Sequence, residues 1–155
     1  LYRFYGLVDL LQDNSGCILF QTPPQFICNE KNFQTLRQFL QLTDPKKRNV
    51  LEFRHSSWWN SEVYELLREY KAGFCTVSGL GMPSDVVCTN SIGYFRFHGP
   101  GQAYASQYSE EQLNEWTEKI KSAVEVSEVN EVYCYFNNDN SGYAIDDAGE
   151  LQTML

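Results

Sequence analysis

The chain has 155 residues, of which 43% are hydrophobic and 15% aromatic, a composition typical of one packed domain rather than a disordered segment. Its formal net charge of −8 makes nucleic acid an improbable partner, because nucleic-acid-binding surfaces are usually basic. No apolar run is long enough to cross a membrane, and five scattered cysteines without a CxxC pair favour reduced thiols in the cytoplasm.

Helical and extended patterns alternate along the chain. Helices are expected over residues 1–12, after the candidate caps Asn29, Asn60 and Ser109, and from Asp146 or Asp147 onward. Strands are expected over residues 17–21, 49–55, 73–78, 94–98 and 131–136, with a loop over 79–91. Gly73 stands where a glycine usually ends a helix. This alternation predicts one α/β domain with parallel strands.

The strands carry one apolar and one polar face. In residues 50–55, Leu51 and Phe53 point one way while Glu52 and Arg54 point the other, because strand side chains alternate. An open sheet with helices on both faces favours nearly continuous apolar strands instead. A parallel TIM-type barrel has helices outside and a lumen inside, so the pattern favours the barrel.

Polar residues gather where these strands end. Gln21, Arg54, His98 and Asn137 all lie at or near the carboxyl end of a predicted strand. In a parallel barrel that end is where ligands bind. We therefore expect a site at the mouth of the barrel.

Glu52, Arg54 and Arg96 form the sharpest group of candidates. Two arginines that face one pocket can hold a carboxylate or phosphate through paired hydrogen bonds. Glu52 can orient one arginine or act as a base. The alternative is a buried ion-pair network that only fixes the lumen, and the sequence leaves both interpretations open.

His98 is the candidate for proton transfer near neutral pH, because it shares the lumen phase of its strand with Arg96. His55 falls on the opposite phase, so we expect it either to cap the next helix or to face a loop. Two histidines are too few for a catalytic zinc site, so no metal is expected. Gly79-Leu80-Gly81 is too short for a dinucleotide fingerprint, and no cofactor is expected.

The other candidate ligand-binding residues are polar or aromatic. Gln21 and Asn137 can orient a substrate, and Tyr135 shares the lumen phase with Asn137. Trp58, like Tyr104 in a later loop, can stack on a sugar or base, although packing onto the barrel rim is an equal alternative. Asn138 and Asp139 read as ordinary turn residues.

Several motifs resemble the YecE-like family, also catalogued as domain of unknown function 72. They are Gln21-Thr-Pro-Pro-Gln-Phe26, Glu52-Phe-Arg-His-Ser-Ser-Trp58, Tyr94-Phe-Arg-Phe-His-Gly99, Tyr108-Ser-Glu-Glu111 and Tyr135-Phe-Asn-Asn-Asp139 with Gly142-Tyr-Ala144. The resemblance implies a TIM-type barrel without a settled activity. Residues 1–155 would form its C-terminal portion, in which residues 17–137 supply the fourth to eighth strands. Asp147 stands where the family commonly has asparagine. The chain begins at Leu1, inside a predicted helix, so we expect it to be part of a longer protein.

Three functions follow as expectations. The first is an enzyme that acts on a small anionic or sugar-like substrate at the barrel mouth. The second is a nucleic-acid-processing barrel of the endonuclease type, a fold-level analogy that the acidic charge disfavours. The third is a non-catalytic piece completed by another chain, because an incomplete barrel leaves strand edges to pair. The sequence leaves the oligomeric state undetermined.

Overall fold

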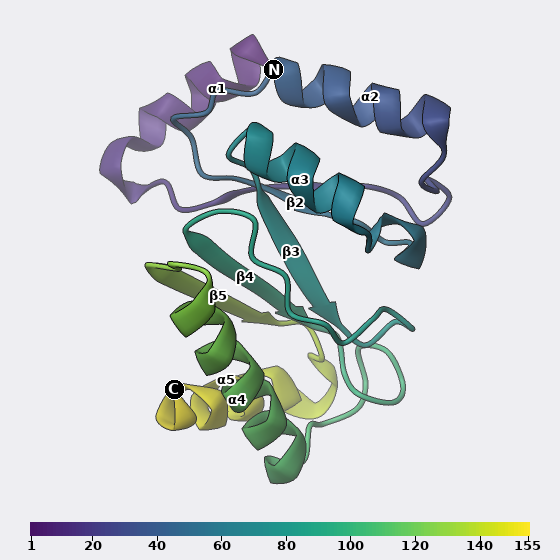
Figure 1. Cartoon of the computed structure of the whole chain (residues 1–155). Helices are drawn as coiled ribbons and strands as arrows, with labels where there is room; N and C mark the ends of the chain where they lie inside the picture. The colour runs from purple at the N-terminus through teal and green to yellow at the C-terminus, as the bar shows by residue number, and fades with distance from the viewer.

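The computed structural model describes residues 1–155, apart from the side chain of Asp13. Five strands form one all-parallel sheet in the order β1-β2-β3-β4-β5 (Figure 1). The strands are β1 (Ile18–Gln21), β2 (Asn49–Glu52), β3 (Gly73–Ser78), β4 (Ile92–Phe97) and β5 (Glu131–Phe136). Each strand pairs with the next strand in the chain, as expected for a succession of parallel β units. The predicted α/β class and parallel sheet are confirmed.

Five helices accompany the sheet, and most begin at the predicted caps. They are α1 (Tyr2–Val8), α2 (Glu30–Gln41), α3 (Ser61–Glu69), α4 (Glu110–Val126) and α5 (Tyr143–Met154). The side chains of Asn29 and Asn60 accept hydrogen bonds from the backbone at the starts of α2 and α3. Ser109 and Gln112 form a complete capping box before α4. In none of the described helices is there a segment long and apolar enough to span a bilayer.

Two hydrophobic cores lie between the sheet and its helices. In Figure 1, α2 and α3 lie in the upper part of the molecule, and α4 and α5 lie in the lower part. Leu51, Phe53 and Phe74 pack under α2 and α3, whereas Phe95 and Phe97 pack under α4 and α5. These are the apolar strand positions that alternation assigns to one face. Their burial directs the neighbouring polar positions to the opposite face.

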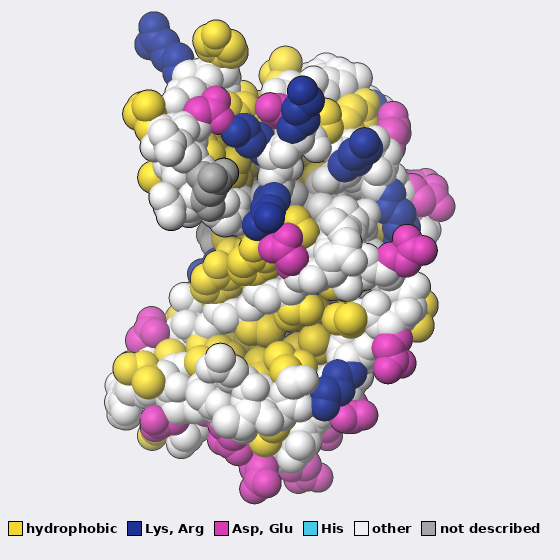
Figure 2. All heavy atoms as spheres, turned by 90° about the vertical axis from the view of Figure 1, so that its left-hand side faces the viewer, with side chains coloured by type: hydrophobic (Ala, Val, Ile, Leu, Met, Phe, Trp, Pro, Cys, Tyr) yellow, Lys and Arg dark blue, Asp and Glu magenta, His cyan; other side chains and the backbone are white. Residues whose placement is uncertain are grey.

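The opposite face, here called the inner face, is partly apolar and partly polar. Val50, Cys75, Val77, Ile92 and Tyr94 form a third apolar cluster on it. The polar residues lie farther along the strands, toward their carboxyl ends. Figure 2 shows that the molecule is hollowed on one side and that hydrophobic side chains are exposed in the hollow.

Several element boundaries differ from the sequence expectation. The second strand ends at Glu52 rather than at residue 55, and α5 begins at Tyr143 rather than at Asp146 or Asp147. The first helix ends at Val8 and continues as a 3-10 turn over Asp9–Asn14. Gly73 does not end α3: Lys71 takes the left-handed conformation there, with φ of 55°, and Gly73 opens β3. Ala72 donates to the carbonyl of Leu67, so the backbone closes the helix around a lysine.

Candidate functional site

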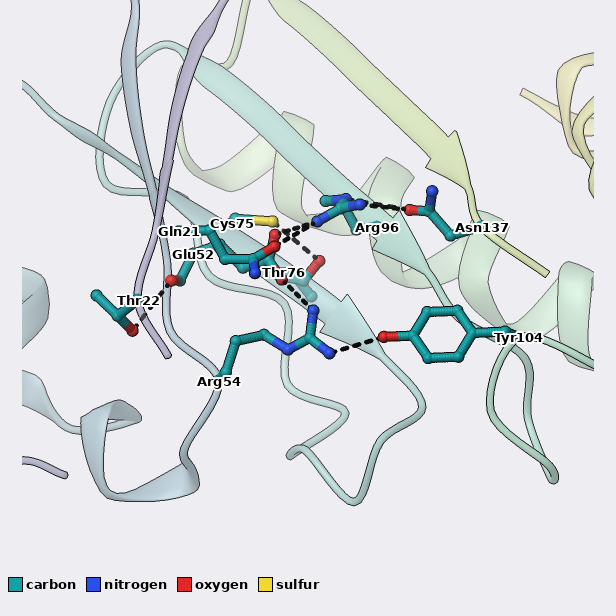
Figure 3. A network of polar contacts seen from close by, with 9 residues as sticks. All are labelled: Gln21, Thr22, Glu52, Arg54, Cys75, Thr76, Arg96, Tyr104 and Asn137. Carbon is teal, nitrogen blue, oxygen red and sulfur yellow. Dashed lines mark hydrogen bonds and ion pairs between the residues drawn. The ribbon is translucent and has the colours of Figure 1, made fainter. Parts of the chain in front are cut away.

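The candidate site lies where the strands end. Gln21 and Glu52 are the last residues of β1 and β2, Arg96 is the next-to-last residue of β4, and Asn137 follows β5 directly. Figure 3 shows their side chains converging from these different strands into one polar network. The expectation that polar residues share this edge of the sheet is confirmed by their contacts.

Glu52 is the buried centre of the network, with a fully buried side chain. Its Oε1 accepts a hydrogen bond from Nη1 of Arg54 at 3.1 Å, and its Oε2 accepts one from Nη1 of Arg96 at 2.5 Å. A buried carboxylate needs such partners, because without them burial of its charge is costly. Both oxygens are therefore committed to arginines. This geometry fits a positioning role for Glu52 better than the role of a base.

Arg96 joins three other strands. Its Nη1 also donates to Oε1 of Gln21 at 3.0 Å, while Nε and Nη2 donate to Oδ1 of Asn137 at 3.1 and 2.7 Å. Four of the five N–H donors of a guanidinium are thus used within the protein. Arg96 is a structural hub with little capacity left for a ligand.

These contacts require a concave inner face. Arg96 belongs to β4 and Gln21 to β1, and two strands lie between them. In a flat sheet, three strand spacings amount to roughly 14 Å, and side chains that stand perpendicular to the sheet do not meet across that distance. The ends of the strands therefore curve toward one another around the polar network.

Arg54 differs from Arg96 in its position and its contacts. It lies two residues beyond the end of β2, and its side chain is 15% exposed. Nη1 donates to Glu52, and Nη2 donates to the hydroxyl of Tyr104 at 2.9 Å. Three of its five N–H donors have no partner among the described residues. Of the two arginines in the network, Arg54 is the one with donors free to bind a ligand.

His98 follows β4 and is 1% exposed. Both of its ring nitrogens are buried without a hydrogen-bond partner among the described residues. Its ring meets that of Tyr104 edge to face, with the centroids 5.2 Å apart. Burial, reinforced by the positive charges of Arg96 and Arg54, lowers the pKa of His98 to about 4. His98 is therefore neutral near pH 7, in contrast to the sequence expectation of titration near neutrality.

Two of the aromatic candidates, Trp58 and Tyr135, make no hydrogen bond to this network among the described residues. Trp58 is completely buried in the helix-side core and stacks on Phe53 with a centroid separation of 4.7 Å. Its Nε1 donates to the carbonyl of Phe26. Packing, the alternative interpretation, accounts for Trp58, and stacking on a ligand does not fit its burial. Tyr135 is 44% exposed on β5 and stacks on Tyr94 at 5.2 Å.

Two further sequence candidates have local structural roles. The Nδ1 atom of His55 accepts a hydrogen bond from the backbone of Ser57, so His55 caps the short turn over Ser56–Trp58. Asn138, read as a turn residue, is fully buried. Its Nδ2 donates to Oδ2 of Asp147 at 2.7 Å and to the carbonyl of Ser106.

The sequence patterns did not predict two of the polar contacts near the ends of the strands. The sequence pattern places Tyr104 among the stacking aromatics, but its hydroxyl accepts a hydrogen bond from Nη2 of Arg54. The buried Asn138–Asp147 pair had no signal other than the departure of Asp147 from the family pattern. Cys75 lies beside the network, where burial raises the pKa of its thiol well above the usual value, so the thiol is not activated. In the described part of the chain, no three His, Cys, Asp or Glu residues form a group suited to a metal.

Comparison with known proteins identifies the family but not an activity. The family model described as "Protein of unknown function DUF72" matches residues 1–155. No curated protein matches the chain.

Three solved structures of two DUF72 family proteins are similar to this chain. One from Thermotoga maritima is 28% identical, with a TM-score of 0.87 over 99% of this chain and 63% of that protein. Two structures from Enterococcus faecalis are each 20% identical, with TM-scores of 0.82 and 0.78, and this chain covers 63% and 65% of them. The chain thus spans just under two thirds of the length of these proteins.

Proposed function

This chain belongs to the DUF72 family of proteins of unknown function, and we propose that it supplies five strands of a parallel β/α barrel whose mouth binds a small oxyanion. Arg54 is the principal anion-binding residue in this proposal, and Glu52, Arg96 and Tyr104 position it. The concave inner face supports the barrel, as does the match to just under two thirds of longer DUF72 proteins. Strands outside residues 1–155 would complete the sheet beside β1 and β5.

The unused donors of Arg54 carry the proposal. Its guanidinium is held by Glu52 on one side and Tyr104 on the other, with three N–H groups left over. A guanidinium that is fixed by two partners loses little rotamer freedom when it binds a ligand. Its planar fork matches the two oxygens of a carboxylate or the oxygens of a phosphate.

His98 adds a second, independent reason for a ligand here. Two unpartnered ring nitrogens in a buried position are costly, and a bound group with donors or acceptors would relieve that cost. An anion bound between Arg54 and His98 would favour the charged imidazole. We therefore expect binding to be accompanied by proton uptake at His98 and to strengthen as the pH falls from 7 toward 5.

Isothermal titration with inorganic phosphate and with acetate tests this function. Binding should weaken at least about tenfold in Arg54→Gln. The variant loses the charge-assisted hydrogen bonds from the guanidinium to the anion, which are the main source of affinity. Arg37→Gln is the matched control, since Arg37 is a partly exposed arginine of α2 whose ion pair is with Glu69. Titrations in two buffers of different ionisation enthalpy measure the proton uptake, which His98→Asn should abolish.

The result that would overturn the proposal is equally specific. If neither anion binds detectably, or if Arg37→Gln weakens binding as much as Arg54→Gln does, the network is only a structural one. Circular dichroism of each variant at the titration temperature separates a loss of binding from a loss of folding.

A further inference from the structure

A second cluster of positive charge lies at the opposite end of the sheet. A cleft of about 440 Å³ there is lined by the segments that precede β2, β3 and β4. Five of the twelve Lys and Arg residues of this acidic chain line it. They are Lys46, Lys47, Arg48, Arg68 and Lys71. Figure 2 shows that Lys and Arg gather in the upper half of one face, whereas Asp and Glu predominate in the lower half.

The positive charge of this cleft is only partly neutralised. No carboxylate residue is among those that line the cleft. Lys47 pairs with Asp9, and Arg48 pairs with Glu131 at 3.1 Å. The remaining three, Lys46, Arg68 and Lys71, make no ion pair within the described side chains. Like charges gathered in this way repel one another, so the arrangement is unfavourable until an anion enters.

Lys71 adds evidence from the backbone. It has a φ of 55°, the left-handed conformation in which glycine is usual at the end of a helix. A lysine in that conformation costs about 1 kcal/mol relative to glycine. Backbone strain of this kind concentrates at functional sites, where the side chain is needed despite its cost. The side chain of Lys71, which has this unfavourable backbone conformation, lines the basic cleft.

Helix polarity explains part of the cluster only. Arg68 lies in the last turn of α3 and Lys71 just beyond it, where cations are favoured by the negative end of the helix. That effect decays within one turn, and it does not account for Lys46, Lys47 and Arg48, which come from the loop between α2 and β2. Two separate segments of the chain therefore contribute cations to the same cleft.

We propose that this cleft binds a small anion that carries several phosphate groups. Its volume falls within the range of small-ligand sites. Three unpaired cations match a ligand with several negative charges better than a single carboxylate. Thr89 and Asn90 also line the cleft. Their side chains donate to the carbonyls of Ala72 and Lys71, which fixes the segment before β4 against the segment between α3 and β3.

Titration calorimetry with sodium tripolyphosphate, at constant ionic strength, tests the site. The double variant Lys46→Gln/Arg68→Gln should weaken binding at least about tenfold, because it removes two of the three unpaired cations. A charge-matched control, Lys31→Gln/Arg37→Gln, removes two cations from α2 outside the cleft and should leave the affinity within about twofold.

Lys71→Gly separates binding from stability. It should raise the melting temperature of the free protein, because it relieves the left-handed lysine, and yet weaken tripolyphosphate binding. If Lys71 had only a structural role, Lys71→Gly would change the melting temperature and the tripolyphosphate affinity in the same direction.

The Lys46→Gln/Arg68→Gln pair made in an Arg54→Gln background locates the bound anion. Arg54→Gln removes the proposed mouth site, so the tripolyphosphate binding that remains in that background should still weaken at least about tenfold when Lys46 and Arg68 are replaced. The proposal is overturned if Arg54→Gln abolishes the binding, if the control pair weakens it as much as the cleft pair does, or if no binding occurs.

Discussion

Arg96 and Glu52 form a 2.5 Å ion pair although 44 residues separate them in the sequence and strand β3 lies between their strands. Both side chains cross the inner face at the carboxyl ends of the strands, and both are largely buried. This pair therefore ties the two halves of the sheet, which pack against different helices, through one contact.

Removing the arginine from this pair should destabilise the fold strongly. In Arg96→Ala, Glu52 keeps only Arg54 as a partner, and Gln21 and Asn137 lose their bonds to the guanidinium. We expect the free energy of unfolding, measured by urea denaturation at pH 7, to fall by about 3–5 kcal/mol, the usual cost of breaking a buried pair.

Two further variants serve as controls for the unfolding free energy of Arg96→Ala. Arg37→Ala removes a partly exposed arginine whose pair with Glu69 is 3.5 Å long, and it should cost less than about 1 kcal/mol. Adding Glu52→Gln to Arg96→Ala should recover part of the lost unfolding free energy, because it removes the buried negative charge that Arg96 no longer neutralises. A loss below about 1 kcal/mol in Arg96→Ala would show that the network contributes little to stability.

Tyr104→Phe tests how Arg54 is positioned. The change removes the hydroxyl that accepts from Nη2 of Arg54 and leaves the bond between Arg54 and Glu52 in place. Under the proposed function, phosphate affinity should fall about threefold to tenfold, since one hydrogen bond that fixes the guanidinium is lost. The melting temperature should change little. Unchanged affinity in this variant would mean that Arg54 needs no orientation by Tyr104.

Local patterns predicted the elements and the two faces of the strands well. The caps Asn29, Asn60 and Ser109 each use a short-range hydrogen bond, which a few consecutive residues determine. Alternation in residues 50–53 correctly separated the core positions from Glu52, because side-chain direction in a strand has a period of two.

Long-range relationships were harder to predict. Tyr104 reaches Arg54 from a loop where it has a φ of 66°, and no periodicity marks such a residue. Trp58 and Asn138 follow strands, where surface and interior positions look alike in sequence, and tertiary packing alone buries them. Likewise, the low pKa of His98 arises from burial and from the charges of Arg96 on the same strand and of Arg54 beyond β2. Its residue type could not reveal this.

His98 should make the protein less stable as the pH falls. Its pKa is about 4 in the folded protein and about 6.5 in an unfolded chain, so the unfolded state takes up the proton first. The stabilisation present above pH 6.5 is lost progressively as the pH drops toward 4. Between pH 7 and pH 5 this group alone lowers the unfolding free energy by about 2 kcal/mol.

Urea denaturation of the wild type and of His98→Asn at pH 7 and pH 5 measures that contribution. The variant should lose about 2 kcal/mol less than the wild type over this interval, because asparagine does not titrate. Equal losses in the two proteins would place the pKa of His98 near its ordinary value.

Asp147 offers a stabilising substitution. This fully buried residue of α5 accepts from the backbone of Tyr108 and from Asn138 through Oδ2, but its Oδ1 has no partner among the described residues. No ion pair within the described side chains compensates its charge. The Oδ1 of Asn138 is likewise unpartnered, so an amide at position 147 can donate where the carboxylate cannot.

We therefore expect Asp147→Asn to raise the free energy of unfolding at pH 7 by about 1–3 kcal/mol, since it removes a buried charge and can satisfy a second buried oxygen. Asp146→Asn is the neighbouring control. Asp146 is exposed in the first turn of α5, where a negative charge is mildly favourable, so its loss should cost less than about 1 kcal/mol. If the carboxylate of Asp147 destabilises the fold, thermal and urea denaturation will show stability gained in Asp147→Asn and lost in Asp146→Asn. A loss of stability in Asp147→Asn would instead show that the backbone of Tyr108 requires a charged acceptor.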